Sequence, residues 1–144
     1  MKKILVAGGA GYIGSHTIIE LCAAGYDVVC GDCYDNSSPD VIARIQDITG
    51  QPLRNYEIDF CDKHAVETLF EAEQFDAVIH FAGLKAVAES IEQPVRYYSN
   101  NLITTINLAH ACSTMKVKSF IFSSSATVYG VPQFLPYTEE HPLT

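Results

Sequence analysis

Three glycines near the start of the chain have the spacing of a phosphate-binding loop. Gly8, Gly11 and Gly14, in the segment VAGGAGYIGSH, lie between a short apolar run and a helical pattern. The first glycine allows a tight turn, the second a close approach of a diphosphate, and the third close packing of helix on strand. Free N–H groups at the start of the helix attract the anion. Because both flanking elements are present, the sequence predicts a dinucleotide site.

An acidic residue closes the next apolar run, as such a site requires. Asp32 ends the segment DVVCGD, where a carboxylate accepts hydrogen bonds from an adenosine ribose and repels a 2′-phosphate. No arginine follows before Arg44, which favours NAD over NADP. The alternative is a solvated turn aspartate. Asp59 ends a later apolar run, and it either reaches the adenine edge or caps the following helix.

Three consecutive serines, Ser123 to Ser125, end the last apolar run, FIFSSS. They either cap a loop or deliver hydroxyl groups to a ligand at the carboxyl end of a strand. Both explanations remain open at this point. Ser125 is the candidate for the ligand contact.

Apolar runs alternate with helical patterns along the chain. The runs predict strands over residues 2–8, 26–32, 54–60, 75–83 and 117–125, and the patterns predict helices over 11–24, 41–48, 65–73 and about 94–115. Asp62 is the expected N-cap of the third helix. Such alternation predicts the α/β class: a doubly wound parallel sheet of Rossmann type with strand order 3-2-1-4-5. Ligands then bind at the carboxyl ends of the strands, where the serines and Asp32 meet.

The last of these helices has an apolar face formed by Leu102, Ile106 and Ala109. We expect this face to pack in the core, and dimerisation is the alternative.

Composition narrows the classes of function. The 144 residues are expected to form one domain, and a net charge of −8 disfavours non-specific nucleic-acid binding. No apolar run approaches the roughly 20 residues of a membrane span, and the apolar start is too short for a signal peptide, so we expect a cytoplasmic protein. The five cysteines, including Cys30 and Cys33 at C-x-x-C spacing, are interpreted as reduced thiols, with no metal site.

Four segments carry a resemblance to a known family. GGAGYIGSH, VIHFAGLKAVAES, YYSNN and FIFSSSATVYG match the extended short-chain dehydrogenases/reductases in order and spacing, and the sequence most closely resembles the UDP-glucose (UDP-galactose) 4-epimerases. The resemblance covers the whole chain but only the first part of the family's usual length. It implies NAD as cofactor, a UDP-hexose as substrate and reversible 4-epimerisation through a 4-keto sugar. A homodimer is left open for the full-length parent.

The resemblance also assigns roles to residues. Those implied to bind the cofactor, besides the three glycines, are Tyr12 and Ile13 at the pyrophosphate, Asp32, Asn36 and Ser37 at the adenosine ribose, Asp59 and Phe60 at adenine, Phe81, Ala82, Gly83 and Lys85 after the fourth strand, Asn100 on the long helix, and Ser123. Ser125 would hydrogen-bond the hydroxyl that is oxidised, and Thr127 would position the hexose.

Two positions separate this chain from similar proteins. Related sugar-nucleotide dehydratases carry Asp-Glu where Ala126 and Thr127 stand, so dehydration is disfavoured. Cys33 replaces an asparagine that is expected in many relatives, which implies a weaker ribose contact.

The catalytic base that the resemblance implies is not in this sequence. The family uses a tyrosine whose pKa is lowered by a lysine four residues later, and none of the eight tyrosines has a lysine at that spacing. The chain also stops before the domain that would hold the substrate. We therefore expect residues 1–144 to be an NAD-binding domain that is inactive alone. The alternative is a non-catalytic NAD-binding module, or half of a split enzyme completed by a partner.

Overall fold

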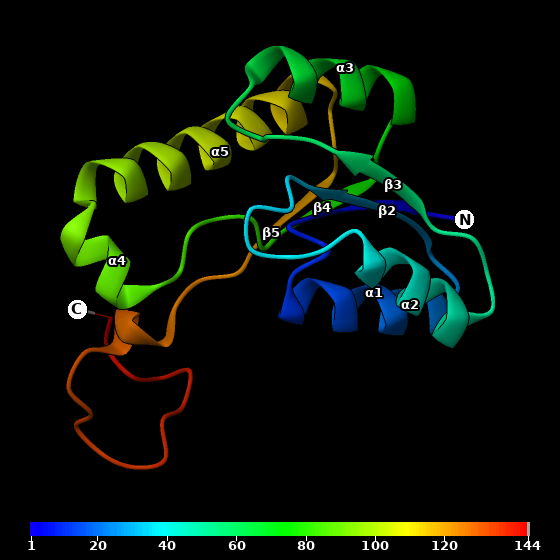
Figure 1. Ribbon diagram of the computed structural model, residues 1–144. Helices are drawn as coiled ribbons and strands as arrows, with labels where there is room; N and C mark the ends of the chain where they lie inside the picture. Colours follow the sequence, from blue (N-terminus) through cyan, green and yellow to red (C-terminus); the bar gives the residue numbers. More distant parts are fainter. Residues whose placement is uncertain (144) are drawn as a thin grey trace.

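The computed structural model describes residues 1–143, which form a five-stranded parallel sheet with helices on both faces (Figure 1). The strands are β1 (Lys3–Ala7), β2 (Asp27–Asp32), β3 (Arg54–Glu57), β4 (Ala77–His80) and β5 (Ser119–Phe122). Their order, β3-β2-β1-β4-β5, confirms the predicted fold class. The predicted ranges 54–60, 75–83 and 117–125 extend beyond β3, β4 and β5 at their carboxyl ends, and the last two also begin two residues before the strands.

Two helices cover each face of the sheet. The helices are α1 (Tyr12–Ala23), α2 (Asp40–Thr49), α3 (Lys63–Glu73), α4 (Val87–Glu92) and α5 (Pro94–Thr114), followed by the short 3-10 helix η1 (Ala126–Tyr129). Figure 1 shows α1 and α2 on one face and α3 and α5 on the other. The short α4 was not predicted, because six residues are too few to establish a helical period. Within residues 1–143 no helix is long and apolar enough to cross a membrane.

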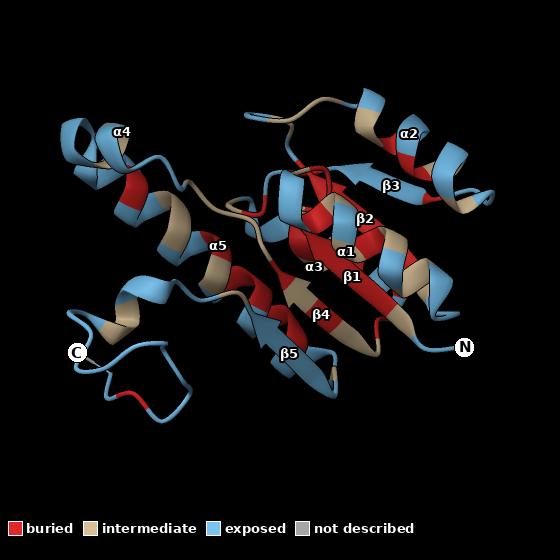
Figure 2. Ribbon diagram, turned by 90° about the horizontal axis from the view of Figure 1, so that it is seen from below, coloured by how far each residue is buried: buried red, intermediate tan, exposed pale blue. Residues whose placement is uncertain are grey.

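The core consists of two layers that share the central strands. Alternate residues of β1 point to opposite faces, so that Leu5 packs with α3 and α5 and Val6 packs with α1 and α2. Figure 2 shows the buried residues concentrated along β1 and β2, whereas the edge strands β3 and β5 are exposed. Because β1 is covered on both sides, its run is continuously apolar rather than alternating.

The prediction that the apolar face of α5 lies in the core is wrong. Leu102 and Ile106 are 56% and 63% exposed, and Ala109 is exposed with them. The buried stripe instead contains Leu108 and Ala111. Helix α5 carries apolar residues on two sides, and periodicity alone does not tell which side faces the sheet. The dimerisation alternative stays a prediction.

All five cysteines are free thiols, as predicted. Cys30 is fully buried in β2, and burial together with the charge of Asp32 raises its pKa to about 12. The C-x-x-C pair therefore has no reactive thiolate at Cys30. Among residues 1–143, no three His, Cys, Asp or Glu side chains gather in a way that could hold a metal ion.

The amino edge of the sheet is held by a charged cluster around Glu73. This side chain is 6% exposed, and its carboxylate accepts hydrogen bonds from Lys3 Nζ (2.8 Å), Arg54 (2.8 Å) and the Tyr56 hydroxyl (2.6 Å). Burial raises the pKa of Glu73, but the hydrogen bonds from Lys3 and Tyr56 and the charge of Arg54 outweigh it and leave the pKa below its usual value. The cluster therefore joins β1, β3 and α3 through one ionised carboxylate.

We predict that Glu73→Gln lowers the free energy of unfolding by about 2 kcal/mol at pH 7, because Lys3 and Arg54 lose their shared charged partner. Urea unfolding measures the change. The control is Glu67→Gln, which breaks an exposed pair with Lys63 at 3.6 Å and should change stability by less than about 0.5 kcal/mol. Equal effects of the two substitutions would contradict this assignment.

Candidate functional site

The predicted site residues lie in loops that leave the carboxyl ends of the strands. In the β1–α1 loop, Gly8 has a φ of +78° and donates its N–H to the Gly31 carbonyl at 2.8 Å. A Cβ atom on Gly8 would lie 2.6 Å from the backbone nitrogen of Ala82. Gly8 therefore makes the predicted tight turn, and it also lets the loop after β1 touch the loop after β4.

The fold requires a glycine at Gly14 but not at Gly11. A Cβ on Gly14 would lie 2.2 Å from the Gly8 carbonyl oxygen, so close packing of α1 on the loop excludes any side chain there. Gly11 is different, since its φ is −69° and the nearest atom to an added Cβ is Gly8 O at 3.4 Å. The fold itself thus tolerates a side chain at Gly11, and that position is free for a ligand to approach.

Sequence reasoning missed Gly9. A Cβ on this residue would lie 2.6 Å from Cys30 Sγ, which belongs to the neighbouring strand β2. The spacing motif does not include this position. Only a prediction of which buried side chain of β2 faces the loop would have identified it.

Asp32 ties the glycine loop to the loop after β2. Its side chain is 7% exposed, and Oδ2 accepts the Ala10 N–H at 2.9 Å. Oδ1 accepts the Tyr34 N–H at 2.9 Å and the Ser37 hydroxyl at 3.1 Å. The alternative of a solvated turn aspartate is therefore wrong. A carboxylate offers about four acceptor sites, so capacity for a further donor remains.

The residues predicted to surround an adenosine differ in how exposed they are to solvent. Asn36 and Asp59 are exposed, and Asp59 Oδ1 accepts the Cys61 N–H at 2.8 Å. Asp62, as predicted, caps α3, which excludes the capping alternative for Asp59. The Phe60 ring is buried, 2.7 Å from where a Cβ on Gly31 would lie. The whole residue is only 4% exposed, and its carbonyl accepts a hydrogen bond from Asn107 Nδ2 at 2.9 Å, so the expectation that Phe60 flanks adenine stays a prediction.

The loop after β4 is anchored to α5. Phe81, Ala82 and Gly83 are partly buried, and Lys85 is exposed. No carboxylate among residues 1–143 lies within ion-pair distance of Lys85, so its charge is available to an anion. Asn100 also lies on α5; its Nδ2 donates to Asn101 Oδ1 at 3.1 Å, and its Oδ1 lies 3.6 Å from Cys61 Sγ in the loop after β3.

The serines after β5 form the cap that was one of the two explanations offered for them, and the ligand contact stays a prediction. The Ser123 N–H donates to the His80 carbonyl at 3.1 Å and continues the β4–β5 pairing. Ser125 is the N-cap of η1, since its Oγ accepts the Thr127 N–H at 3.3 Å. Its Oγ also lies 2.8 Å from the Thr127 hydroxyl, and both side chains are exposed. The cap thus holds two adjacent hydroxyl groups at the surface.

Tyr12 and Ile13 begin α1 and are 83% and 59% exposed. They line a shallow hollow of about 410 Å³ on the outer side of α1, together with His16, Thr17 and Glu20. No other predicted site residue lines this hollow. The hollow is therefore separate from the glycine loop. Tyr12 and Ile13 are next to that loop only through their backbone, in the first turn of α1.

His80 is a second residue that sequence reasoning missed. It ends β4 directly before the predicted loop, is 1% exposed, and its Nε2 lies 2.9 Å from Thr105 Oγ1. Nδ1 has no hydrogen-bond partner among residues 1–143. Burial lowers the pKa of His80 to about 4, and the nearby charge of Lys85 acts in the same direction. The imidazole is therefore neutral at pH 7.

We predict that His80 makes the fold acid-sensitive between pH 6.5 and pH 4. In this range the unfolded chain protonates the imidazole and the folded chain does not, so the free energy of unfolding falls as the pH falls. Glutamine does not titrate in this range. Between pH 6.5 and pH 4.5 the free energy of unfolding of His80→Gln should therefore fall by about 2 kcal/mol less than that of the unsubstituted chain. Urea unfolding across this range checks it. Parallel curves for the two proteins would show that His80 does not titrate as described.

A parallel sheet of this order, with a glycine loop at the first strand and a bonded acid at the second, defines a Rossmann-type nucleotide-binding protein. Residues 4–144 match the family described as NAD dependent epimerase/dehydratase. The chain belongs to this family.

Individual relatives agree with the sequence resemblance. The chain is 53% identical over 140 residues to a UDP-glucose 4-epimerase of Bacillus subtilis, covering 97% of this chain and 41% of that protein. It is 50% identical over 148 residues to the UDP-glucose 4-epimerase of Mus musculus, covering 99% and 43%. A crystal structure of UDP-glucose 4-epimerase from Bifidobacterium longum in complex with NAD+ and UDP superposes with a TM-score of 0.95 at 50% identity, over 99% of this chain and 43% of that one.

These comparisons confirm the resemblance to UDP-glucose 4-epimerases. They also show that the chain spans little more than two fifths of the length of these relatives. The matched part is the amino-terminal part of the relatives.

Proposed function

We propose that residues 1–144 form the NAD-binding domain of an enzyme that reversibly epimerises a UDP-hexose at C4. The observation that carries this proposal is the arrangement around Asp32. One buried carboxylate holds the glycine loop and the loop after β2 together by accepting three hydrogen bonds, and one of its about four acceptor sites has no donor among residues 1–143. A ribose diol supplies the donors that such a carboxylate lacks.

The adenosine half of NAD is assigned to the ends of β1, β2 and β3. The pyrophosphate binds the first turn of α1, at Gly8, Gly11, Tyr12, Ile13 and Gly14, where exposed N–H groups and the helix dipole favour an anion. Asp32 binds the ribose, with Asn36 and Ser37 along the same loop. Asp59, whose side chain is exposed, and Phe60 are assigned to the two sides of adenine, as the resemblance implies.

The nicotinamide half is assigned to the ends of β4 and β5. Lys85, which has no carboxylate within ion-pair distance among residues 1–143, offers a positive charge, and Phe81, Ala82, Gly83, Asn100 and Ser123 are assigned to the same half. The exposed hydroxyls of Ser125 and Thr127, 2.8 Å apart, are assigned to the hexose. Ser125 is proposed to hydrogen-bond the hydroxyl at C4 and to help move its proton, and Thr127 to position the sugar. NAD, when bound, supplies a reversible acceptor for hydride.

None of the residues assigned above serves as the catalytic base. Oxidation of an alcohol requires a group that accepts the hydroxyl proton, and none of the eight tyrosines has the lysine at four-residue spacing that the family uses. The alternative, a non-catalytic NAD-binding module or half of a split enzyme, stays a prediction. For the full-length parent, a homodimer through the exposed apolar face of α5 remains a prediction.

The first test concerns the cofactor. Gly11→Ala should keep the stability of the unsubstituted chain, because an added Cβ meets no atom closer than 3.4 Å. It should nevertheless weaken NAD binding at least about tenfold by separating the diphosphate from the loop amides. Calorimetric titration measures the affinity, and thermal unfolding measures the stability.

Gly14→Ala is the control for this substitution. Its Cβ would lie 2.2 Å from Gly8 O, so it should reduce stability and binding together. If Gly11→Ala binds NAD as tightly as the unsubstituted chain, the placement of the diphosphate at this loop is refuted.

The second test concerns catalysis. Incubated with NAD and UDP-galactose, the 144-residue chain should give no appreciable UDP-glucose, because general-base catalysis alone contributes roughly 10²–10⁴-fold to the rate. Product analysis by chromatography measures the rate, and native mass measurement reports any partner. Turnover close to that of a full-length relative would refute the assignment. Recovery of activity only in a heteromeric complex would support the split enzyme.

A further inference from the structure

Asn101 on α5 holds the loop after β4 through both backbone polar groups of one residue, Leu84. Its Oδ1 accepts the Leu84 N–H at 2.8 Å, and its Nδ2 donates to the Leu84 carbonyl at 3.0 Å. A Cβ on neighbouring Gly83, whose φ is +148°, would lie 3.0 Å from Asn101 Oδ1. The loop therefore approaches α5 so closely that the conformation of Gly83 and the amide of Asn101 depend on each other.

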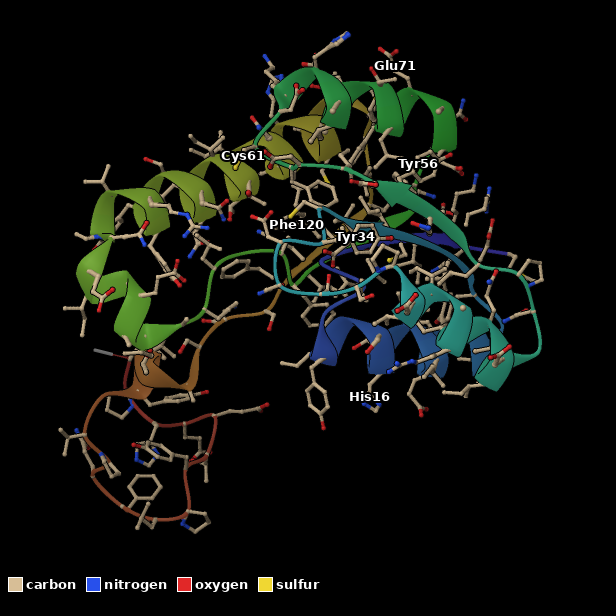
Figure 3. The ribbon with its side chains drawn as sticks, in the orientation of Figure 1. His16, Tyr34, Tyr56, Cys61, Glu71 and Phe120 are labelled. Atoms are coloured by element: carbon tan, nitrogen blue, oxygen red, sulfur yellow. The ribbon has the colours of Figure 1, made fainter. Side chains whose placement is uncertain are left out.

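Asn107, six residues further along α5, holds a different loop in a similar way. Its Nδ2 donates to the Phe60 carbonyl at 2.9 Å and to the Cys61 carbonyl at 3.0 Å, and its side chain is 9% exposed. Cys61 adds a contact between its Sγ and Thr104 Oγ1 at 3.3 Å. Figure 3 shows Cys61, in the loop after β3, beside α5.

These two loops come from strands that are not neighbours. Strands β3 and β4 are three places apart in the sheet order, which is about 14 Å at the usual strand spacing. Asn101 and Asn107 are separated by about 9 Å along the helix axis, and their side chains extend the reach. One helix thus contacts the backbone of both loops, one on each side of the switch between β1 and β4.

We propose that Asn101 and Asn107 are positioning residues that make α5 a common support for the two halves of the cofactor site. Asn107 fixes the loop at the adenosine half, which contains Asp59. Asn101 fixes the loop at the nicotinamide half, which contains Lys85. Neither amide is assigned a contact with the cofactor. The proposal depends on the proposed function in one respect only, which is the assignment of each loop to one half of NAD.

The test uses two ligands and two matched variants of the 144-residue chain. Asn107→Leu should weaken 5′-AMP and NAD by the same factor, about tenfold, because the loop at adenine loses two hydrogen bonds. Asn101→Leu should weaken NAD binding about tenfold and change the affinity for 5′-AMP by less than about twofold, because AMP does not reach the loop after β4. Each variant is the control for the other. Thr105 lies on the same helix, and its hydroxyl contacts His80 of β4 and donates to the Asn101 backbone carbonyl, but it bonds neither loop. Thr105→Val should therefore change stability without changing either affinity.

If the two asparagines only stabilised the fold, both variants would bind both ligands more weakly by the same factor, and that result would overturn the proposal. Amide hydrogen exchange tests it independently of any ligand. Leu84 should exchange faster in Asn101→Leu, and the 59–62 segment should exchange faster in Asn107→Leu. If the unsubstituted chain binds neither ligand but the exchange pattern appears, the proposed function fails and the positioning role stands. Unchanged exchange would refute the role.

Should a leucine variant not fold, the isosteric Asn101→Asp and Asn107→Asp replace it. Each removes the donors to the loop carbonyls and keeps the shape of the side chain. The same selective pattern of affinities is expected, and its absence contradicts the proposal.

Discussion

The site depends on one buried carboxylate that bonds to two loops at once. Asp32 accepts the Ala10 N–H from the glycine loop with one oxygen and the Tyr34 N–H and Ser37 hydroxyl with the other. Leaving a buried donor without its acceptor costs about 1–3 kcal/mol, so the two loops are strongly constrained to keep this arrangement. Close contacts of Gly8 with Ala82 and of Gly14 with Gly8 extend the same constraint toward β4 and α1.

Stability and binding are assigned to opposite edges of the sheet. The Glu73 cluster, with Lys3, Arg54 and Tyr56, joins the elements at the amino edge, where no predicted site residue lies. The carboxyl edge carries the glycine loop, the exposed Lys85 and the hydroxyls of Ser125 and Thr127. Helix α5 connects the layers, because its buried stripe packs on the sheet while its asparagines hold the loops above the strand ends.

Local patterns in the sequence were sufficient for the strand order, the tight turn of the glycine loop, the position of Asp32 at the end of β2 and the Asp62 cap. Each depends on residues close together in the chain or on the alternation of elements. The role of α5 was not accessible in the same way. Asn101 bonds a residue 17 positions away and Asn107 bonds residues 46 and 47 positions away, and no periodicity encodes such partners. His80 was missed for a similar reason, since an apolar run hides a buried histidine whose partner is on another element. The exposed face of α5 was assigned to the core because both of its sides are apolar.

The most direct measurement of the central claim is the affinity of this chain for NAD compared with NADP, determined by calorimetric titration under identical conditions. The buried Asp32 carboxylate at the ribose predicts that NAD binds and that NADP binds at least about tenfold more weakly, because the 2′-phosphate places a second negative charge beside it. Equal affinity for both dinucleotides would contradict the placement of Asp32 at the ribose, and binding of neither would contradict the assignment of the glycine loop.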